Sequence, residues 1–219
     1  MKTMLVLMCW LAALPLLGCD ARGVSVGSEE LCVLDPRFAA LPANPAHEQV
    51  SNCATLGENV LVNASFESPA VVDCPDGAFC QFPAADVDGW NTNSNTQVIE
   101  VWTDGWRDVP SPDGGQFAEL DAESQDTLWQ DVALAPGQLM YWSLLHRGRH
   151  GIETMEVRIG PPEATRSQQV FASPTGAWSA HSGLYRVGPA ETLTRVELAS
   201  LTGTTDGNLI DAVVFAPVE

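Results

Sequence analysis

The sequence predicts an all-β protein, an antiparallel β-sandwich of about 155 residues that begins near Asn59. Beyond this residue, short runs rich in Val, Ile, Leu, Phe and Trp alternate with clusters of Gly, Pro, Asn and Asp. Several runs also alternate in polarity, as in ETMEVRI (153–159), where every second side chain is apolar. No stretch combines the period of an amphipathic helix with helix-capping residues.

Nine strands are expected in chain order, separated by turn-forming residues. They cover residues 60–66, 97–102, 116–121, 127–134, 138–145, 153–159, 183–187, 192–201 and 208–215. The turns SPDGG, APG and IGPP are expected to end strands. Proline has no backbone N–H to donate to a neighbouring strand, and glycine can adopt the backbone angles of a tight turn. The predicted domain, residues 59–219, is long enough to bury a hydrophobic core.

The first 18 residues have the pattern of an export signal, with Lys2 followed by an apolar run that is too short for a good membrane span. LLGC, ending at Cys19, resembles a bacterial lipobox. The resemblance implies cleavage before Cys19 and lipidation of its thiol. We therefore expect an exported protein, held by its lipid anchor alone on the periplasmic or cell-surface side of a bacterial membrane. The alternative is an ordinary signal peptide with a cysteine near the cut.

The charge is strongly acidic, with 10 basic residues against 28 acidic ones. Lys2 is the only lysine, so removal of residues 1–18 leaves 9 arginines and a net charge of -19. Such a surface repels phosphate backbones and anionic lipid headgroups. Nucleic acid is therefore excluded as an expected partner.

Residues 19–58 lack sustained periodicity and are predicted to be a tether with a disulfide-clipped lead-in. Beyond the lipobox the chain carries four cysteines: Cys32, Cys53, Cys74 and Cys80. Behind an export signal, an even number predicts two disulfides, for which three pairings exist. The most local pairing joins Cys32 to Cys53 and Cys74 to Cys80, across the turn at 75–77. Zinc is disfavoured, because no CxxC pair is present.

Three motifs, in order, resemble those of a known family. NASFESP (63–69), DGW (88–90) and GNLIDAVVF (207–215) resemble the opening, the glycine–tryptophan and the closing strand of galactose-binding-like jelly-roll carbohydrate-binding modules. Residues 117–149 resemble the middle of these modules, so the pattern covers residues 59–217. Ala64 and Ala212 depart from it, replacing a glycine and an aspartate. The resemblance implies the jelly-roll form of the sandwich.

The resemblance also implies a structural Ca²⁺ ion, with Glu67 and Asp211 as side-chain ligands. The first and last strands of a jelly roll often lie side by side, and two carboxylates brought together repel unless a proton or cation lies between them. Calcium takes carboxylates and backbone carbonyls, which the loop at Asp88–Gly89 is expected to supply. The alternative is that both acids are exposed to water.

A candidate ligand-binding surface lies in EVWTDGWRD. Asp104 and Gly105 form a turn between Trp102 and Trp106, which places at least one indole near a loop. Sugars present C–H faces to aromatic rings, and their hydroxyls seek carboxylates and guanidinium groups. We therefore predict a rim of Glu100, Asp104, Trp106 and Arg107, with Trp102 as a further candidate ligand-binding residue. Core packing is expected instead for Trp90, Trp129 and Trp142, while Trp178 is a second aromatic residue carried by a loop. A loop tryptophan that only plugs the end of the sandwich is the alternative.

LLHRGRHG (144–151) gathers two histidines and two arginines in an acidic chain. Gly148 and Gly151 break the element that would pair the histidines, so a zinc site is disfavoured. Strand alternation puts His146 and Arg147 on opposite faces. Arg147 and Arg149 remain as candidate donors to sugar hydroxyls, or as partners of local acids such as Glu153.

The sequence therefore favours a non-catalytic, lipid-anchored exported module that binds a polysaccharide or other glycan. A structural or adhesion lipoprotein that binds another protein with the same fold is the alternative. An enzyme is a third possibility: no G-x-S-x-G motif is present, although the many acids permit carboxylate pairs suited to glycoside hydrolysis.

Overall fold

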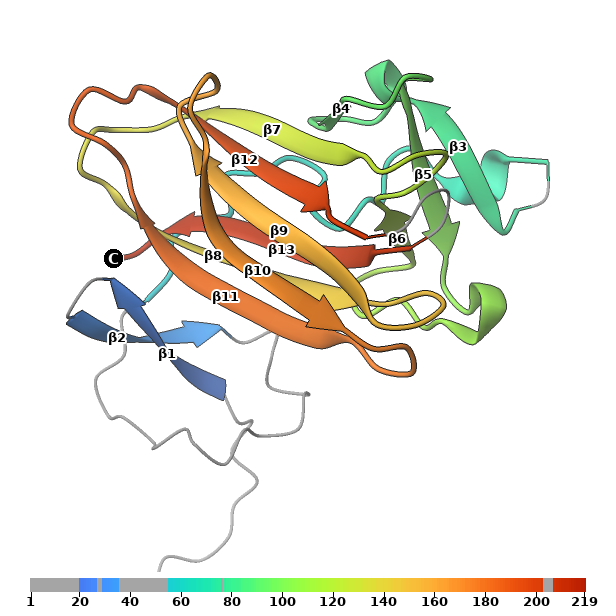
Figure 1. The fold of residues 1–219 in the computed structure, drawn as a ribbon, viewed down its shortest axis with the longest axis horizontal. Coiled ribbons are helices and arrows are strands. Elements are labelled where there is room, and N and C mark those ends of the chain that lie inside the picture. Colours follow the sequence, from blue (N-terminus) through green and yellow to red (C-terminus); the bar gives the residue numbers. More distant parts are fainter. Residues whose placement is uncertain (1–19, 27–28, 36–54, 76, 203–206) are drawn as a thin grey trace, which may run out of the picture.

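The computed structural model describes residues 20–26, 29–35, 55–75, 77–202 and 207–219. In these ranges the chain is almost entirely β-structure, and every strand pairing is antiparallel. A six-stranded and a five-stranded sheet pack face to face, and a separate hairpin lies beside them (Figure 1). The predicted all-β antiparallel sandwich is confirmed.

The six-stranded sheet has the order β11-β8-β13-β6-β5-β3. Its strands are β11 (Ser179–Arg186), β8 (Leu139–Arg147), β13 (Leu209–Pro217), β6 (Gln116–Glu119), β5 (Val98–Thr103) and β3 (Phe79–Pro83). The five-stranded sheet has the order β10-β9-β12-β7-β4. Its strands are β10 (Arg166–Ser173), β9 (Glu153–Gly160), β12 (Leu193–Ser200), β7 (Thr127–Ala133) and β4 (Asn91–Thr92).

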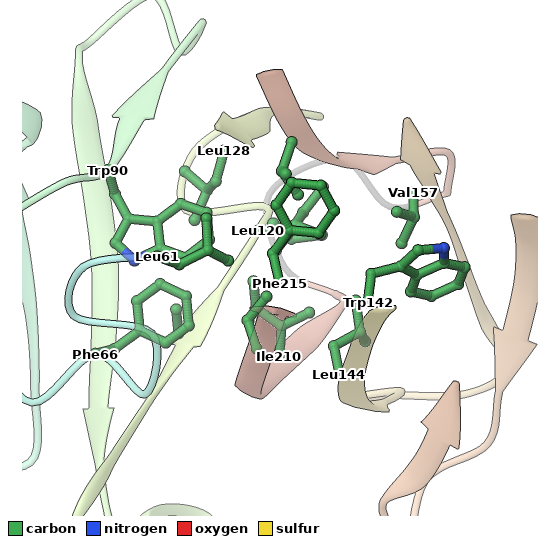
Figure 2. Packing of buried hydrophobic residues seen from close by; sticks show 14 of the residues in the cluster. Leu61, Phe66, Trp90, Leu120, Leu128, Trp142, Leu144, Val157, Ile210 and Phe215 are labelled. Atoms are coloured by element: carbon green, nitrogen blue, oxygen red, sulfur yellow. The ribbon is translucent and has the colours of Figure 1, made fainter. Parts of the chain in front are cut away.

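The main hydrophobic core fills the space between the two sheets (Figure 2). Trp142 and Phe215 enter it from the six-stranded sheet, and Leu128 and Val157 enter it from the five-stranded sheet. Each fully buried side chain of this size stabilises the fold by about 1.5–3 kcal/mol. The inward positions follow the period of two seen in the sequence, which is why most strands between 97 and 215, although not β10 (Arg166–Ser173), were predictable.

The opening segment is not the strand predicted at 60–66. Asn63 and Phe66 have φ angles of 50° and 57°, which interrupt extended backbone. The segment nevertheless runs along β13, because the Val60 amide donates to the Phe215 carbonyl at 2.9 Å. Phe66 stacks on Trp90 with ring centroids 5.0 Å apart, and Trp90 Nε1 donates to the Asn63 carbonyl at 2.9 Å. The predicted core position of Trp90 is therefore confirmed.

Three strands of the sandwich were not predicted, and all three lie at sheet edges. β10 is largely exposed, and β3 ends in Pro83, which suits an edge that needs no further ladder donor. β4 also ends a sheet but has only two residues. β11 begins at Ser179, four residues before the predicted start at residue 183. The first part of the strand, SAHSG, was missed because it lacks the usual strand-forming side chains.

The predicted lead-in contains a hairpin of β1 (Asp20–Val26) and β2 (Glu29–Asp35), which was not predicted from the sequence. β1 lies beside β11 (Figure 1). Downstream, Leu56 forms a β-bridge with Val218, so the chain joins the sandwich before Asn59. The signal segment 1–18, Cys19 and Cys53 lie outside the described residues, and of Cys32 only its place in β2 is described. The predicted Cys32–Cys53 disulfide therefore stays a prediction.

The second predicted disulfide is confirmed. Cys74 and Cys80 are bonded, with their Cα atoms 6.2 Å apart. The bond ties the short 3-10 helix η2 (Val71–Asp73) to the start of β3. In the part of the chain that the structure describes, no helix is both long and apolar enough to cross a membrane.

Candidate functional site

The candidate site lies on the face of the six-stranded sheet that is turned away from the main core. In β5, Ile99 and Val101 point into the core, so the alternate residues Glu100 and Trp102 point outward. In the same way, Ala118 of β6 points inward while Phe117 and Glu119 point outward. We call this surface the outer face of the six-stranded sheet.

The strand register arranges the outward side chains in two rows. The polar row consists of Gln81, Glu100, Glu119 and Arg147, with the apolar Leu209 between the last two; the five residues come from five neighbouring strands. The aromatic row consists of Phe79, Trp102 and Phe117, from three of them. Carboxylates, a guanidinium group and indole rings are thus placed together by pairings between segments far apart in the sequence.

Two loop residues complete an aromatic cluster over the second row. Trp106, in the 3-10 helix η4 (Trp106–Asp108), stacks on Phe79 at 6.1 Å and meets Trp102 edge-on at 6.4 Å between ring centroids. Trp178 meets Phe117 edge-on at 5.6 Å, and its Nε1 donates to the Pro110 carbonyl at 2.8 Å. The aromatic cluster is therefore Phe79, Trp102, Trp106, Phe117 and Trp178. Trp106 and Trp178 are half-buried, whereas Trp102 is 1% exposed.

Two arginines cover this cluster. The Arg149 guanidinium carbon lies 4.8 Å from the centre of the Trp102 ring, and that of Arg107 lies 5.7 Å from Trp106 and 6.0 Å from Trp102. Arg107 is exposed, and it and Asp108 have φ angles of 52° and 62°. Non-glycine residues rarely adopt this conformation, and those that do are often found in tight turns and at ligand-binding sites. The structure thus brings together four of the residues that were predicted to bind a ligand: Trp102, Trp106, Arg107 and Arg149.

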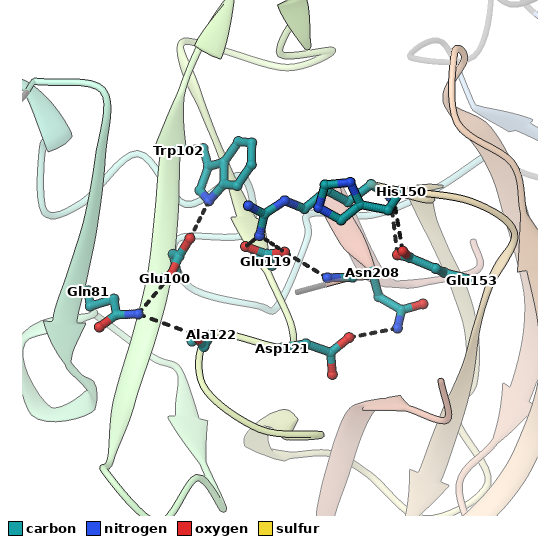
Figure 3. Close-up of polar contacts among 11 residues, drawn as sticks. Gln81, Glu100, Trp102, Glu119, Asp121, Ala122, His150, Glu153 and Asn208 are labelled. Carbon is teal, nitrogen blue, oxygen red and sulfur yellow. Dashed lines mark hydrogen bonds and ion pairs between the residues drawn. The ribbon is translucent and has the colours of Figure 1, made fainter. Parts of the chain in front are cut away.

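Two neighbouring carboxylates form the floor of the site (Figure 3). Glu100 lies directly across from Glu119, and the two residues are 6% and 1% exposed. Glu100 Oε1 accepts from Trp102 Nε1 at 2.7 Å, and its Oε2 accepts from Gln81 Nε2 at 2.9 Å. Glu100 therefore lies beneath the aromatic cluster, and not on the rim where it was expected.

Glu119 is held by a cation and an amide. Arg149 Nη1 donates to both of its oxygens, at 2.9 Å and 3.0 Å, and the Gly207 amide donates to Oε1 at 2.8 Å. Burial raises the pKa of Glu119 to about 8, and the charge of Glu100 adds to the increase, although Gly207 and Arg149 act in the opposite direction. Removal of Arg149 would leave Glu119 without its guanidinium partner, beside the buried carboxylate of Glu100.

The turn that carries Arg149 is fixed by Glu153. The amides of Arg149 and His150 donate to Glu153 Oε2 and Oε1 at 3.1 Å and 3.2 Å (Figure 3). Glu153 thus positions the backbone, and Glu119, not Glu153, receives the Arg149 guanidinium. The cross-strand position of Glu119 could not be read from the sequence, so this partner was missed.

His146 and Arg147 lie on opposite faces of β8, as predicted. His146 is fully buried in the sandwich, where Nδ1 contacts Ser173 Oγ at 2.8 Å and Nε2 contacts Asn208 Oδ1 at 2.9 Å. Burial lowers the pKa of His146 to about 4. Arg147 is half-buried on the outer face, and its buried Nε has no hydrogen-bond partner among the described residues.

Asp104 does not join the site in this arrangement. Its Oδ1 accepts from the Ser111 amide at 2.8 Å, so the side chain stabilises the loop between β5 and β6. It remains exposed at the edge of that loop. Asp104 is thus near Trp106 in sequence, but its carboxylate accepts a hydrogen bond that stabilises the loop.

Two tryptophans expected in the core have different positions. Trp142 is in the core, as predicted. Trp129 is not: it is half-buried on the outward face of the five-stranded sheet, with the Arg195 guanidinium carbon 5.0 Å from its ring centre. The neighbouring Gln130 points inward, where it accepts from the Val62 amide at 3.0 Å and donates to the Val62 carbonyl at 2.7 Å. These two bonds keep a polar residue buried and turn Trp129 outward.

Glu67 and Asp211, the expected calcium ligands, lie against the same loop, residues 111–116. Glu67 Oε1 accepts from the Gly115 and Gln116 amides, each at 2.9 Å. Asp211 Oδ2 accepts from the Asp113 amide and Ser111 Oγ, each at 3.2 Å. This loop, and not Asp88–Gly89, is the one shared by both acids.

Glu67 and Asp211 supply carboxylate oxygens, the kind of ligand that a hard cation takes. Asp211 is 0% exposed, and burial raises its pKa to about 8, while the amides of Ala212 and Asp113 lower it. The nearby charge that acts on it is that of Asp113, another acid. Within the described ranges, no three His, Cys, Asp or Glu side chains are grouped to hold a metal. Backbone carbonyls, which calcium accepts, would have to complete the set.

No protein-family model matches the chain, and no curated protein sequence matches it. Among solved structures, TmCBM61 in complex with β-1,4-galactotriose is 15% identical, has a TM-score of 0.47, and is matched over 73% of this chain and 98% of its own. A second structure contains the CBM22-1–GH10 modules of Clostridium thermocellum endo-1,4-β-D-xylanase 10B, complexed with xylohexaose. It is 13% identical with a TM-score of 0.50, and the match covers 74% of this chain and 29% of that chain.

The enzymatically active domain of bacteriophage CBA120 tailspike protein 4 is 13% identical with a TM-score of 0.46, and the match covers 73% of this chain and 21% of that chain. At such identities a likeness shows the fold alone. The chain has the jelly-roll β-sandwich fold found in carbohydrate-binding modules.

Proposed function

We propose that the protein is a non-catalytic module that binds a polysaccharide or other glycan on the outer face of the six-stranded sheet. The observation that carries the proposal is the convergence of Trp106 and Arg107 with Arg149 over buried carboxylates. Aromatic rings pack against the C–H faces of sugars, and guanidinium groups donate to hydroxyls. Both kinds of group are available here on one surface.

Each part of the site has a separate role in the proposal. Trp106 and Trp178, the half-buried rings, supply the stacking surfaces. Trp102 supports Trp106, and Phe117 supports Trp178. Arg107 supplies the exposed donor, and Arg147 adds donors further along the polar row. Glu100, Glu119 and Gln81 hold the rings and Arg149 in place, so the surface is organised before any ligand binds.

The burial of the carboxylate pair supports a binding role over hydrolysis. A glycosidase needs two carboxyl groups that flank the scissile bond. Glu119 has a side chain that is 0% exposed, and Glu100 is tied to Trp102 and Gln81. Neither carboxyl group is open to a glycosidic bond in this arrangement.

The proposal is tested by substituting one tryptophan on each sheet. Trp106→Ala should weaken binding of the purified protein to polysaccharides in affinity electrophoresis by about tenfold or more, because a central aromatic contact is lost. Trp129→Ala is the matched control: its ring is also half-buried beneath an arginine, but on the opposite sheet. Equal effects of the two substitutions contradict the proposed site. Absence of glycan binding across a glycan array points to the alternative of a protein partner.

We also propose that Ca²⁺ joins Glu67 and Asp211. The ion would supply positive charge between two acids that share one loop and would fasten the opening segment to β13. Chelation by EDTA should then lower the melting temperature, and Asp211→Asn should abolish that difference. An unchanged melting temperature contradicts the calcium proposal.

The lipid anchor remains a proposal that rests on LLGC. Lipidation of Cys19 would hold an exported binding module at a bacterial membrane on its periplasmic or cell-surface side. Metabolic labelling with a radioactive fatty acid should mark the protein, and Cys19→Ala should remove the label. Absence of label in the unaltered protein contradicts the anchor.

A further inference from the structure

A groove of about 610 Å³ lies at the other end of the sandwich from the turns that carry Arg149 and Trp178. Most of its lining residues come from the β9–β10 turn, residues 161–165, and from the β11–β12 connection, residues 187–192. Figure 1 shows where these two segments lie. These segments share no residue with the aromatic cluster or the polar row. The groove is therefore a separate candidate site.

The wall of the groove is apolar and stiff. Pro161, Pro162 and Pro189 line it, together with the half-buried ring of Tyr185. Proline fixes its own φ angle, so these walls lose little freedom when a ligand binds. Pyrrolidine C–H groups and a phenol ring form the kind of surface against which a sugar ring packs.

The phenol of Tyr185 is anchored from behind. Its hydroxyl donates to Glu191 Oε2 at 2.6 Å, and the same oxygen accepts from the Gly188 amide at 3.0 Å. Glu191 Oε1 accepts from Thr194 Oγ1 at 2.6 Å. Glu191 is 7% exposed and both its oxygens are occupied, so its charge is satisfied within the wall. The ring of Tyr185 is thus held in one orientation.

Two exposed arginines line the groove, and the β9–β10 turn beside them also carries one exposed acid, Glu163. Arg166 and Arg186 are exposed, and Arg186 Nη1 donates to the Gly137 carbonyl at 3.2 Å. Arg166 is close enough to Tyr185 for its charge to act on the phenol. In a chain with 10 basic and 28 acidic residues, two arginines at one groove form a local exception to the acidic surface. That exception favours an anionic group on the ligand.

We propose that this groove binds a terminal uronic acid residue of a glycan, with the sugar ring against Tyr185 and the prolines and the carboxylate on Arg166 and Arg186. The planar fork of a guanidinium group matches a carboxylate, and two forks distinguish an acidic sugar from its neutral counterpart. A terminal residue is favoured over a long polyanion, because the net charge of -18 would repel the rest of such a chain.

The test compares an acidic with a neutral disaccharide by calorimetry on the purified protein. Digalacturonate should bind at this groove. α-1,4-Galactobiose, which has the same linkage but no carboxylate to pair with the arginines, should bind at least about tenfold more weakly. The double substitution Arg166→Gln and Arg186→Gln should remove the difference. Both side chains are exposed, and circular dichroism would check that the fold is retained.

Trp106→Ala separates this site from the outer face of the six-stranded sheet. It should leave digalacturonate binding unchanged if the groove is the site. Failure of digalacturonate to bind, equal affinity for the two disaccharides, or loss of binding in Trp106→Ala alone overturns the inference. None of these results alters the polysaccharide assay that tests the proposed function.

Discussion

Glu119→Gln tests the electrostatics of the candidate site through the pH dependence of stability. The pKa of the Glu119 carboxyl is about 8 in the folded protein, compared with 4.5 for an unperturbed glutamate, mainly because of burial. The folded state therefore binds a proton that the unfolded state releases between these values, and the free energy of unfolding falls as pH rises from 4.5 to 8. Glutamine mimics the protonated carboxyl and removes this dependence.

The size of the effect follows from the proton linkage. Each pH unit inside the window changes the contribution of one carboxyl by about 1.4 kcal/mol, so two units change it by about 2–3 kcal/mol. Between pH 5.5 and 7.5 the unaltered protein should therefore lose about 2–3 kcal/mol relative to Glu119→Gln. Urea unfolding at the two pH values measures this difference, and Glu163→Gln controls for the removal of one surface acid.

The competing influence is Arg149, which favours the ionised form of Glu119. If the stability difference between the unaltered protein and Glu119→Gln does not change between pH 5.5 and 7.5, the ion pair prevails over burial. The inference that the buried Glu119 carboxyl stays protonated up to about pH 8 would then be wrong.

Three further predictions concern the sandwich that positions the site. Gly183→Ala should destabilise by about 1–3 kcal/mol in urea unfolding, because a methyl group there would lie 2.6 Å from the Trp142 ring; an unchanged midpoint contradicts this. Replacing both Cys74 and Cys80 by serine should lower the free energy of unfolding by about 2 kcal/mol, and no loss would contradict the stabilising role of their bond. His146, with its pKa lowered to about 4 by burial, should show no protonation by NMR between pH 7 and 5.5; a midpoint near 6.5 refutes its burial. Because the unfolded state is protonated first, His146 should also make the protein less stable as pH falls from 6.5 to 4.

The sequence predicted the strands whose inward and outward residues differ in polarity. β9 is an example, since Met155, Val157 and Ile159 are all buried. β10 escaped because an edge strand exposes both faces, and the polar RSQQ carries no period of two. Trp129 was misplaced because its neighbour Gln130 is buried by two hydrogen bonds to Val62, which no local pattern reveals.

The candidate site was predictable in part for the same reason. The Asp104–Gly105 turn indicates that Trp106 and Arg107 lie on a loop, and alternation separates His146 from Arg147. The meeting of Glu100 with Glu119 depends on the register of β5 with β6. The position of Arg149 over Trp102 depends on the fold of a distant turn. Such non-local pairings become visible only once the sheets are assembled.

The most direct test of the glycan-binding face is an NMR titration that follows the indole N–H signals of the folded domain during addition of an oligosaccharide bound in the array. We expect the signals of Trp106 and Trp178 to shift in a saturable manner, while those of Trp90 and Trp142 in the core stay unchanged. A saturable shift at Trp129 with none at Trp106 would contradict the central claim, because it would place the ligand on the five-stranded sheet.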